Sequence, residues 1–478
     1  MLAKHLRQYF HKLYLLTLTC DCDLLDKNKR IILGSRVGGF VLSWEASSSF
    51  FFFPEIRDSL GGGNAIATSW ILTITGVVTA ALLLQAGRLG EKIGYQSLYR
   101  SGILLFATGT ILSALSPNLS ALILARAITA VGLAVMAPAG TSIITSLAPS
   151  GKEGFAIARL NFIIGMSGVL GPIVTTLLIN NFSWRYGYLS SLPFTLLALF
   201  ITWKDAEVPG LNKQRKIAPV DSFLCALAIG LLVFALSKSD EWGWVSAYFL
   251  TGSGLALFLA FFLIRKSQLS EDPQIPLFLF KKRIYRFSAI LAFVIAIPMF
   301  SGWIVLLLFM TDIWNFGIVK AGLFLTVMPA TMLIFVLPGN RIANKFGYFP
   351  VIFFGGIIYS LCFFQFWYFA GEKESVFHLL IAVFGAGFGM ALIWNSATSA
   401  ASLNLESDRM GSALGLIKSL ERIGSALGIA LTTALITNVG SEPTATLYKR
   451  GILVIIIGSF TSALLAFGFI KKKSTIEY

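Results

Sequence analysis

The sequence is poor in charge, cysteine and histidine. Asp, Glu, Lys and Arg make up 13% of its 478 residues, about half the ~25% usual in soluble proteins. Four cysteines are too few and too scattered for a disulfide framework. Cys20, Cys22, His5 and His11 form a conceivable metal site, but a reducing cytoplasmic tail is the favoured interpretation. These shortages exclude a soluble enzyme, a disordered chain and a disulfide-rich scaffold.

Long apolar runs dominate what remains. Hydrophobic residues reach 56% and the mean hydropathy is +0.78. Because about 20 mostly apolar residues are needed for a helix to cross a bilayer, the chain predicts fourteen membrane helices, with twelve plus two surface helices as the alternative. The fourteen run approximately over 32–54, 65–87, 98–116, 119–142, 155–180, 185–202, 219–237, 245–264, 285–311, 318–339, 348–370, 376–400, 411–438 and 450–470.

The net charge of +15 has two possible meanings, a nucleic-acid partner or a cytoplasmic membrane face. With an even helix count, the termini and the loops on their side hold 27 Lys+Arg and 13 acids, and the opposite loops hold seven of each. By the positive-inside rule both termini are therefore cytoplasmic. The charge predicts a multi-pass protein of the cell inner membrane and no nucleic-acid partner.

Two loops repeat one pattern 253 residues apart. Gly87-Arg88-Leu89-Gly90-Glu91-Lys92-Ile93-Gly94 follows the second predicted helix, and Asn340-Arg341-Ile342-Ala343-Asn344-Lys345-Phe346-Gly347 follows the tenth. Both are on the predicted cytoplasmic side, as expected for the duplicated halves of a secondary transporter.

With these motifs the sequence resembles the major facilitator superfamily, and within it the fourteen-helix drug:proton antiporter family, from about residue 32 to 470. Gly87, Leu89, Glu91, Lys92 and Gly94 match the signature loop, with Glu91 where Asp is usual. Further matches are Arg126 with Gly132, the Gly171-Pro172 pair, Trp184-Arg185-Tyr186 with Pro193, and Glu45 nine residues before Pro54. Departures include Tyr95 and Gln96 in place of basic residues, and Ser167, Thr175 and Thr176 in place of glycines.

The resemblance implies an all-α membrane protein with two six-helix bundles facing each other across a substrate path. The bundles would span 31–203 and 285–470, separated by a linker with two extra helices at 204–284 and flanked by cytoplasmic tails at 1–30 and 471–478. Gly168, Gly171 and Pro172 would form the antiporter-type motif of the fifth helix. The loop Gly87 to Gly94 would face the start of the thirteenth helix, near Asp408, Arg409 and Gly411, and act as a gate.

Charges inside predicted helices are costly, at about 2.5–3.5 kcal/mol each. Glu45 lies about 13 Å and Arg126 about 10 Å below the outer ends of their predicted helices, at a rise of ~1.5 Å per residue. We expect them to form a proton and substrate coupling site, with a purely structural ion pair as the alternative. Lys418, Glu421 and Arg422 share one face of the thirteenth helix, where snorkelling to the cytoplasmic surface is the simpler interpretation. Candidate cavity residues are Trp44, Trp303, Trp394 and Asn395.

The chain lacks a phosphate-binding loop and any catalytic constellation, so we expect no enzyme, no cofactor and no metal. The predicted function is proton-coupled efflux of small organic or drug-like molecules by alternating access, with the proton gradient as the energy source. An uptake symporter for a small metabolite and a transport-inactive membrane sensor are the alternatives. The expected partners are a small-molecule substrate, protons and the lipid bilayer, and the expected state is a monomer.

Overall fold

The computed structural model describes residues 27–60, 65–148, 153–203, 219–269, 277–402, 410–436 and 444–473. Within these ranges the chain is entirely helical. Of the predicted tails 1–30 and 471–478, residues 1–26, which hold the tail's cysteines and histidines, and residues 474–478 lie outside the described residues, as do Asp408 and Arg409. Residues 27–30 and 471–473, predicted as tail, are helical.

The membrane-length helices follow the order predicted from the apolar runs. Their bounds are α2 Lys27–Ser59, α3 Ala65–Ile93, α4 Tyr95–Leu115, α5 Leu119–Ser146, α6 Glu153–Asn181, α8 Leu192–Trp203 preceded by the short α7 Trp184–Leu189, α9 Pro219–Ser237, α11 Ala247–Leu269, α12 Arg283–Leu308, α13 Ile318–Phe346, α14 Tyr348–Phe369, α15 Val376–Ser402, α16 Met410–Ile436 and α17 Ala445–Lys473. Three short elements complete the described chain, α10 Ser239–Trp242, the 3-10 helix Leu277–Lys281 and the π-helix Phe309–Ile313.

Thirteen helical spans in the described residues are long and apolar enough to cross a membrane, with α7 and α8 joined as one. The remaining long helix, α2, has 33 residues and a polar middle with Glu45 and Ser47 to Ser49. With α2 the helices match the fourteen predicted. Each span is helical because an α-helix lets a single segment satisfy all its backbone hydrogen bonds internally, where lipid offers no partners.

Some helix ends differ from the predictions. Helix α2 begins at Lys27 and continues through Pro54 to Ser59, so it is five residues longer at each end than the predicted helix 32–54. The sixth predicted helix is interrupted between Leu189 and Leu192. The apolar pattern marks the part of a helix that lipid can cover, so it does not report the polar turns that extend α2 at both ends.

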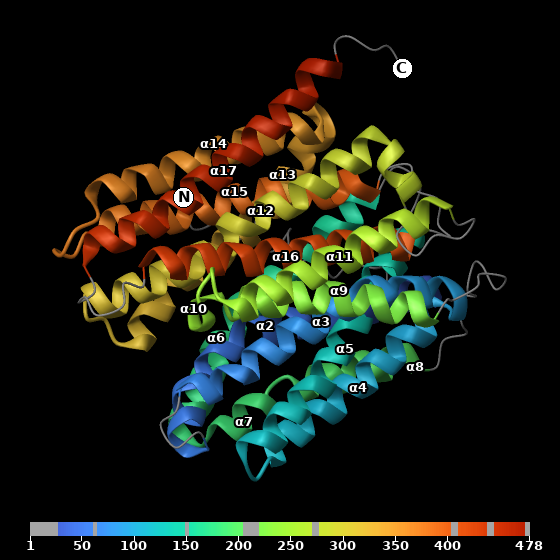
Figure 1. Ribbon diagram of the computed structural model, residues 1–478, viewed down its shortest axis with the longest axis horizontal. Coiled ribbons are helices and arrows are strands. Elements are labelled where there is room, and N and C mark those ends of the chain that lie inside the picture. The colour runs from blue at the N-terminus through green and yellow to red at the C-terminus, as the bar shows by residue number, and fades with distance from the viewer. Residues whose placement is uncertain are drawn as a thin grey trace, which may run out of the picture.

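The helices divide into two groups by their contacts (Figure 1). Helices α2 to α8 pack mainly on one another, as do α12 to α17. The most extensive contacts between the groups are α3 with α16, α6 with α13, α6 with α15, and α5 with α16. We call α2–α8 the first bundle and α12–α17 the second bundle.

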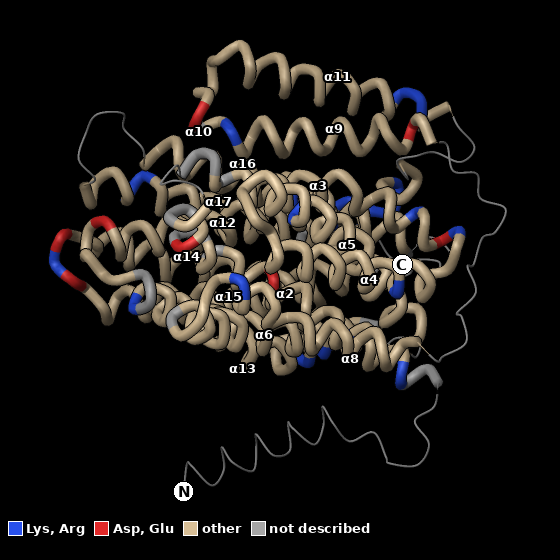
Figure 2. The backbone as a smooth tube through the Cα atoms, turned by 90° about the horizontal axis from the view of Figure 1, so that it is seen from below, with Lys and Arg blue, Asp and Glu red and all other residues tan. Residues whose placement is uncertain are grey.

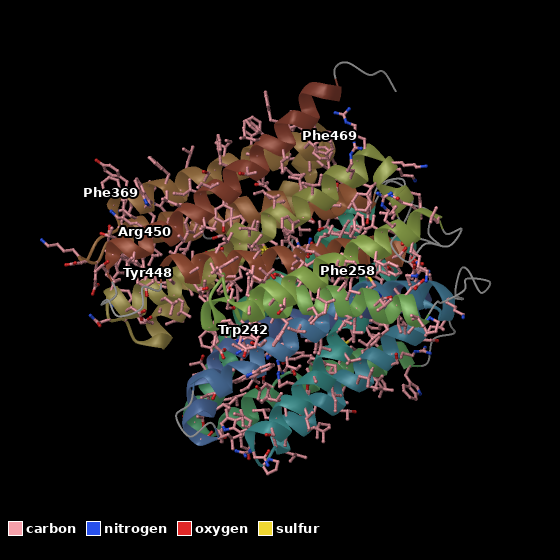
Figure 3. The ribbon with its side chains drawn as sticks, viewed as in Figure 1. Trp242, Phe258, Phe369, Tyr448, Arg450 and Phe469 are labelled. Atoms are coloured by element: carbon pink, nitrogen blue, oxygen red, sulfur yellow. The ribbon has the colours of Figure 1, made fainter. Side chains whose placement is uncertain are left out.

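The remaining pair, α9 and α11, forms a hairpin on the outside of this assembly (Figure 2). Helix α9 packs on α3 of the first bundle and on α16 of the second, so it covers the seam between them. Figure 3 shows Trp242 of α10 and Phe258 of α11 on this hairpin, and the Phe258 side chain is exposed, as expected for a lipid-facing helix.

Lys and Arg gather at the end of the bundles where α3 and α13 end and α6, α12 and α16 begin (Figure 2). We call this the basic end and the other the opposite end. The basic end is the side predicted to be cytoplasmic.

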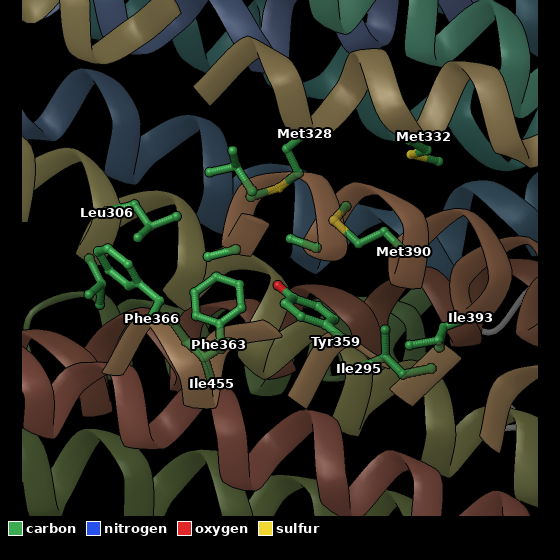
Figure 4. Close-up of a cluster of buried hydrophobic side chains, with 14 of the residues drawn as sticks. Ile295, Leu306, Met328, Met332, Tyr359, Phe363, Phe366, Met390, Ile393 and Ile455 are labelled. Carbon is green, nitrogen blue, oxygen red and sulfur yellow. The ribbon is translucent and has the colours of Figure 1, made fainter. Parts of the chain in front are cut away.

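Aromatic and sulfur-containing side chains fill the core of the second bundle (Figure 4). Tyr359, Phe363 and Phe366 of α14 pack with Met328 of α13 and Met390 of α15. This core holds the helices of the second bundle together, because closely packed apolar surface inside a bundle supplies dispersion contacts that lipid would not match as well.

The prediction that the two repeated motifs are loops is wrong, because Gly87 to Ile93 form the last turns of α3 and Asn340 to Phe346 form the last turns of α13. Each motif ends in a matching turn. Gly94, between α3 and α4, has φ 98° and ψ 136°, and Gly347, between α13 and α14, has φ 93° and ψ 153°. Both conformations disfavour residues with a Cβ, which explains why each copy of the pattern ends in glycine. The shared geometry supports the duplication inferred from sequence.

Candidate functional site

An ion pair lies in the interior of the first bundle. Arg126 Nη1 of α5 is 2.5 Å from Glu45 Oε1 of α2, and the two side chains are 1% and 4% exposed. The sequence placed both charges at similar depth, and the structure brings them into contact. Two buried charges stabilise a bundle poorly even when paired, so the cost of this pair points toward a role beyond packing.

Two neighbours of the pair were not identified from the sequence. Ser49, one helical turn after Glu45, donates to Glu45 Oε1 at 2.9 Å, and Arg126 Nη2 donates to Ser49 Oγ at 3.4 Å. The ring of Tyr188 lies 5.2 Å from the Arg126 guanidinium carbon and 4.3 Å from the ring of Phe52. The spacing of four residues could have revealed Ser49. Tyr188 comes from the interrupted sixth helix and gives no such signal.

Two glycines of α6 allow close packing on α2 of its own bundle and on α13 of the second bundle. A Cβ at Gly171 would lie 2.9 Å from Ser47 Oγ and 3.0 Å from Ser48 Oγ of α2. A Cβ at Gly168 would lie 3.2 Å from Pro329 of α13, across the seam. Pro172 follows within the same helix. The motif therefore packs beside the helix that carries Glu45 and against the opposite bundle.

The signature loop contacts the start of α16. Glu91 is fully buried, and its Oε1 accepts a hydrogen bond from the Ser412 backbone N–H at 2.5 Å. The Tyr95 hydroxyl accepts one from the Gly411 N–H at 2.9 Å. A carboxylate is favoured at a helix N-terminus because the macrodipole and the free N–H groups are both positive there.

Backbone contact at this point requires glycine on both sides. A Cβ on Gly87 would collide with the Gly411 carbonyl oxygen, and a Cβ on Gly411 would collide with the Gly87 carbonyl oxygen. In the same loop Arg88 is buried, whereas Leu89 and Lys92 are partly buried. The expected position of the loop, facing the start of this helix, agrees with the structure.

The second copy of the loop also reaches the opposite bundle, at the start of α6. Asn340 Nδ2 donates to the Gly154 carbonyl at 3.2 Å. Deeper in the interface, Asn161 Nδ2 of α6 donates to Asn395 Oδ1 of α15 at 3.1 Å. These hydrogen bonds and those of the first copy join the two bundles at the basic end.

The four candidate cavity residues occupy different surroundings. Trp44 donates to Ser190 Oγ at 2.9 Å and packs on Phe194, so its described contacts stay within the first bundle. Trp303 is partly buried against the core of the second bundle. Asn395 joins the bundles, and Trp394 lies beneath a lysine of α16. In the described part of the chain, no group of three or more His, Cys, Asp or Glu could hold a metal ion.

Membrane-length helices in two bundles, with paired charges in the interior and reciprocal contacts at one end, define the class of multi-pass transporters. The sequence matches the Major Facilitator Superfamily over residues 37–429, with a second match over 288–475. The chain belongs to this superfamily. Its family and fold are those of transporters and not of enzymes.

Several relatives have similar sequences. The uncharacterized MFS-type transporter EfpA of Mycobacterium tuberculosis is 27% identical over 423 residues, covering 84% of this chain and 76% of the relative. The riboflavin transporter RibZ of Clostridioides difficile is 26% identical and covers 59% of this chain and 61% of that protein. The multidrug transporter protein MdtP of Bacillus subtilis is 24% identical and covers 70% and 61%.

Solved structures support the fold alone. The human organic anion transporter MFSD10 superposes with a TM-score of 0.66 at 14% identity, covering 90% of this chain and 99% of that chain. At this identity the match gives the arrangement of the helices and no information about substrate.

Proposed function

We propose that the protein is a proton-coupled secondary transporter that exports small organic molecules by alternating access. The Glu45–Arg126 ion pair carries this proposal, because a carboxylate that can be neutralised inside the membrane is suited to carry a proton. Support for drug-like substrates comes from the multidrug relative MdtP. The proposed location is the cell inner membrane, with both termini cytoplasmic and a monomer as the working unit.

The proposed cycle uses the two bundles as bodies that rock about the central seam. A proton that reaches Glu45 from the opposite end cancels its charge, and Arg126 is then held by Ser49 and Tyr188 alone. Release of that proton at the basic end restores the ion pair. Each turn of the proposed cycle therefore couples inward movement of protons to outward movement of substrate. The hydrogen bond from Ser412 to Glu91 stabilises the state that is closed at the basic end.

The test of this proposal is transport by Glu45→Gln in proteoliposomes with an imposed pH gradient. We expect gradient-driven transport to fall by at least tenfold, because Gln cannot take up and release a proton, while exchange without a gradient persists. Glu374→Gln in the exposed loop before α15 is the matched control. Normal gradient-driven transport by Glu45→Gln would contradict the proposed coupling.

An uptake symporter for a small metabolite is the second candidate, and similarity to the riboflavin transporter RibZ supports a metabolite as the substrate. The same proteoliposomes separate the two directions. Substrate that accumulates on the side from which protons enter indicates antiport, and substrate that moves with the protons indicates symport. A transport-inactive sensor would show neither movement.

A further inference from the structure

The charges on α16 form a second polar site, separate from the Glu45–Arg126 pair. Lys418, Glu421, Arg422 and Ser425 follow the i, i+3, i+4, i+7 spacing of one helix face. Other faces of α16 are occupied by packing. Leu416 and Ile423 pack toward α3 and α9, and a Cβ on Gly424 would collide with the Phe293 carbonyl of α12. The polar face is thus left to the interior, on a helix that contacts α3 and α5 of the first bundle.

Lys418 is held in this interior and does not reach the membrane surface. Its Nζ lies 2.8 Å and 3.0 Å from the two carboxylate oxygens of Glu421. The same ammonium is 4.7 Å from the centre of the Trp394 ring on α15. The side chains of Lys418 and Glu421 are 22% and 9% exposed. The carboxylate of Glu421 and the indole of Trp394 together hold the Lys418 ammonium in one position.

Arg422 lies in the middle of the membrane helix. It stands twelve residues after Met410 and fourteen before Ile436 in a helix of 27 residues, so each end is about 18 Å or more away at ~1.5 Å per residue. That distance is too long for the Arg422 side chain to reach the surface, so snorkelling, the interpretation favoured from the sequence for Lys418, Glu421 and Arg422, does not suit Arg422. Among the described residues the Arg422 side chain has no ion pair or hydrogen bond, although the Glu421 charge is close enough to act on it.

The charged cluster on α16 carries a net charge of +1, because Lys418 and Arg422 share the single carboxylate of Glu421. Lys418 holds that carboxylate by its ion pair. A guanidinium at mid-membrane is costly unless an anion meets it. The indole of Trp394 on α15, which lies beside Lys418 at the same face of α16, offers an apolar surface to a planar ring.

We propose that the polar face of α16 binds the anionic group of the transported molecule at Arg422, with its planar aromatic part against Trp394. The substrate class is then aromatic carboxylates and similar aromatic anions, and not the aromatic cations that an acidic interior would select. This inference rests on the proposed function for its biological meaning, since it names the substrate class of the same transporter. It concerns equilibrium binding, which needs no proton gradient.

The experiment compares two planar dyes of opposite charge, fluorescein and ethidium, by fluorescence anisotropy with the purified full-length protein in detergent. We expect fluorescein to bind at least tenfold more tightly than ethidium. Arg422→Gln should weaken fluorescein binding at least tenfold and should not weaken ethidium binding, because it removes a positive charge that attracts the anion and repels the cation and leaves the ring contact. Arg422→Lys should recover most of the fluorescein affinity.

Arg265→Gln is the matched control, since it makes the same change at an exposed position of α11. Ser425→Glu is a second variant, which adds a carboxylate one turn from Arg422 and should reduce fluorescein binding in the same direction. Absence of fluorescein binding by the unaltered protein, tighter binding of ethidium, or unchanged fluorescein affinity in Arg422→Gln would each overturn the proposal. Selective fluorescein binding by a protein that shows no gradient-driven transport would overturn the proposed function and leave this inference standing.

Discussion

The repeated motifs at the ends of α3 and α13 share a sequence pattern and are followed by the same glycine conformation, yet they contact the opposite bundle through different hydrogen bonds. In the first copy the buried carboxylate of Glu91 accepts from the backbone of α16. At the equivalent position of the second copy, Asn344 is exposed and bonds to Asn340 and Tyr348 of its own bundle. There Asn340 instead reaches the Gly154 carbonyl of α6.

This difference shows that the two halves contact each other at equivalent places, while the free energies of the two contacts differ. A charged acceptor at a helix N-terminus is stronger than a neutral amide bond to a carbonyl. The first copy is therefore expected to dominate the stability of the closed basic end. Each prediction below is measured as the closed fraction, from the distance between spin labels at the exposed residues Ile93 and Ile342, one on each bundle.

The largest expected effect is that of Gly87→Val. Its side chain would collide with the Gly411 carbonyl, so the closed state should lose at least about a hundredfold in population, since overpacked backbone contacts cost of the order of 3 kcal/mol. Gly76→Val on the same helix is the control, because a Cβ there meets nothing within 4 Å. If both variants had the same closed fraction, the close backbone contact between Gly87 and Gly411 would not contribute to the stability of the closed state.

The charge of the first copy is tested by Glu91→Gln, which keeps an acceptor for the Ser412 N–H and removes the negative charge. We expect about a tenfold loss of the closed state, or about 1.4 kcal/mol, in the range found for hydrogen bonds to charged groups. Asn344→Asp adds a charge at the matching place of the second copy and should change the closed fraction less than twofold. Equal shifts in the two variants would mean that the copies are energetically alike.

The smallest effect is expected for the neutral bonds. Asn340→Ala removes the bond to Gly154, and Tyr95→Phe removes the bond from Gly411. Each should reduce the closed population about fivefold, or about 1 kcal/mol, because a net neutral hydrogen bond contributes about that much. If Asn340→Ala lowered the closed fraction more than Glu91→Gln, the second copy would contribute more than the first to the stability of the closed state.

Much of the fold follows from the sequence because lipid imposes simple rules. Apolar length predicted the order and number of the membrane helices, and the loop repeat predicted two matching turns. The position of the α9–α11 hairpin was beyond such reasoning, since its apolar residues are equally suited to any lipid-facing groove. The interruption of the sixth helix near Ser190 and Ser191 likewise depends on tertiary contacts.

The site could be predicted in part. Glu45 and Arg126 stand out because charges are rare in apolar helices, and their contact followed from equal depth. Tyr188 could not be placed beside them without knowing how the sixth helix bends. Arg422 shows a different limit: the predicted helix 411–438 already placed it near the middle, but the sequence did not show that Lys418 takes the Glu421 carboxylate in an ion pair. The roles of all these residues stay predictions until transport is measured.

The α9–α11 hairpin gives the two seams between the bundles unequal freedom. One flank, α3 against α16, is strapped by a helix that touches both partners, whereas α6 and α13 lie on the opposite side of the molecule from that strap (Figure 2). Because α9 contacts both α3 and α16, separating these two helices would break contacts on α9 as well, whereas small sliding movements would keep them. The widest excursions of the bundles, and any sideways entry of oily molecules from the bilayer, are then expected along the α6–α13 flank.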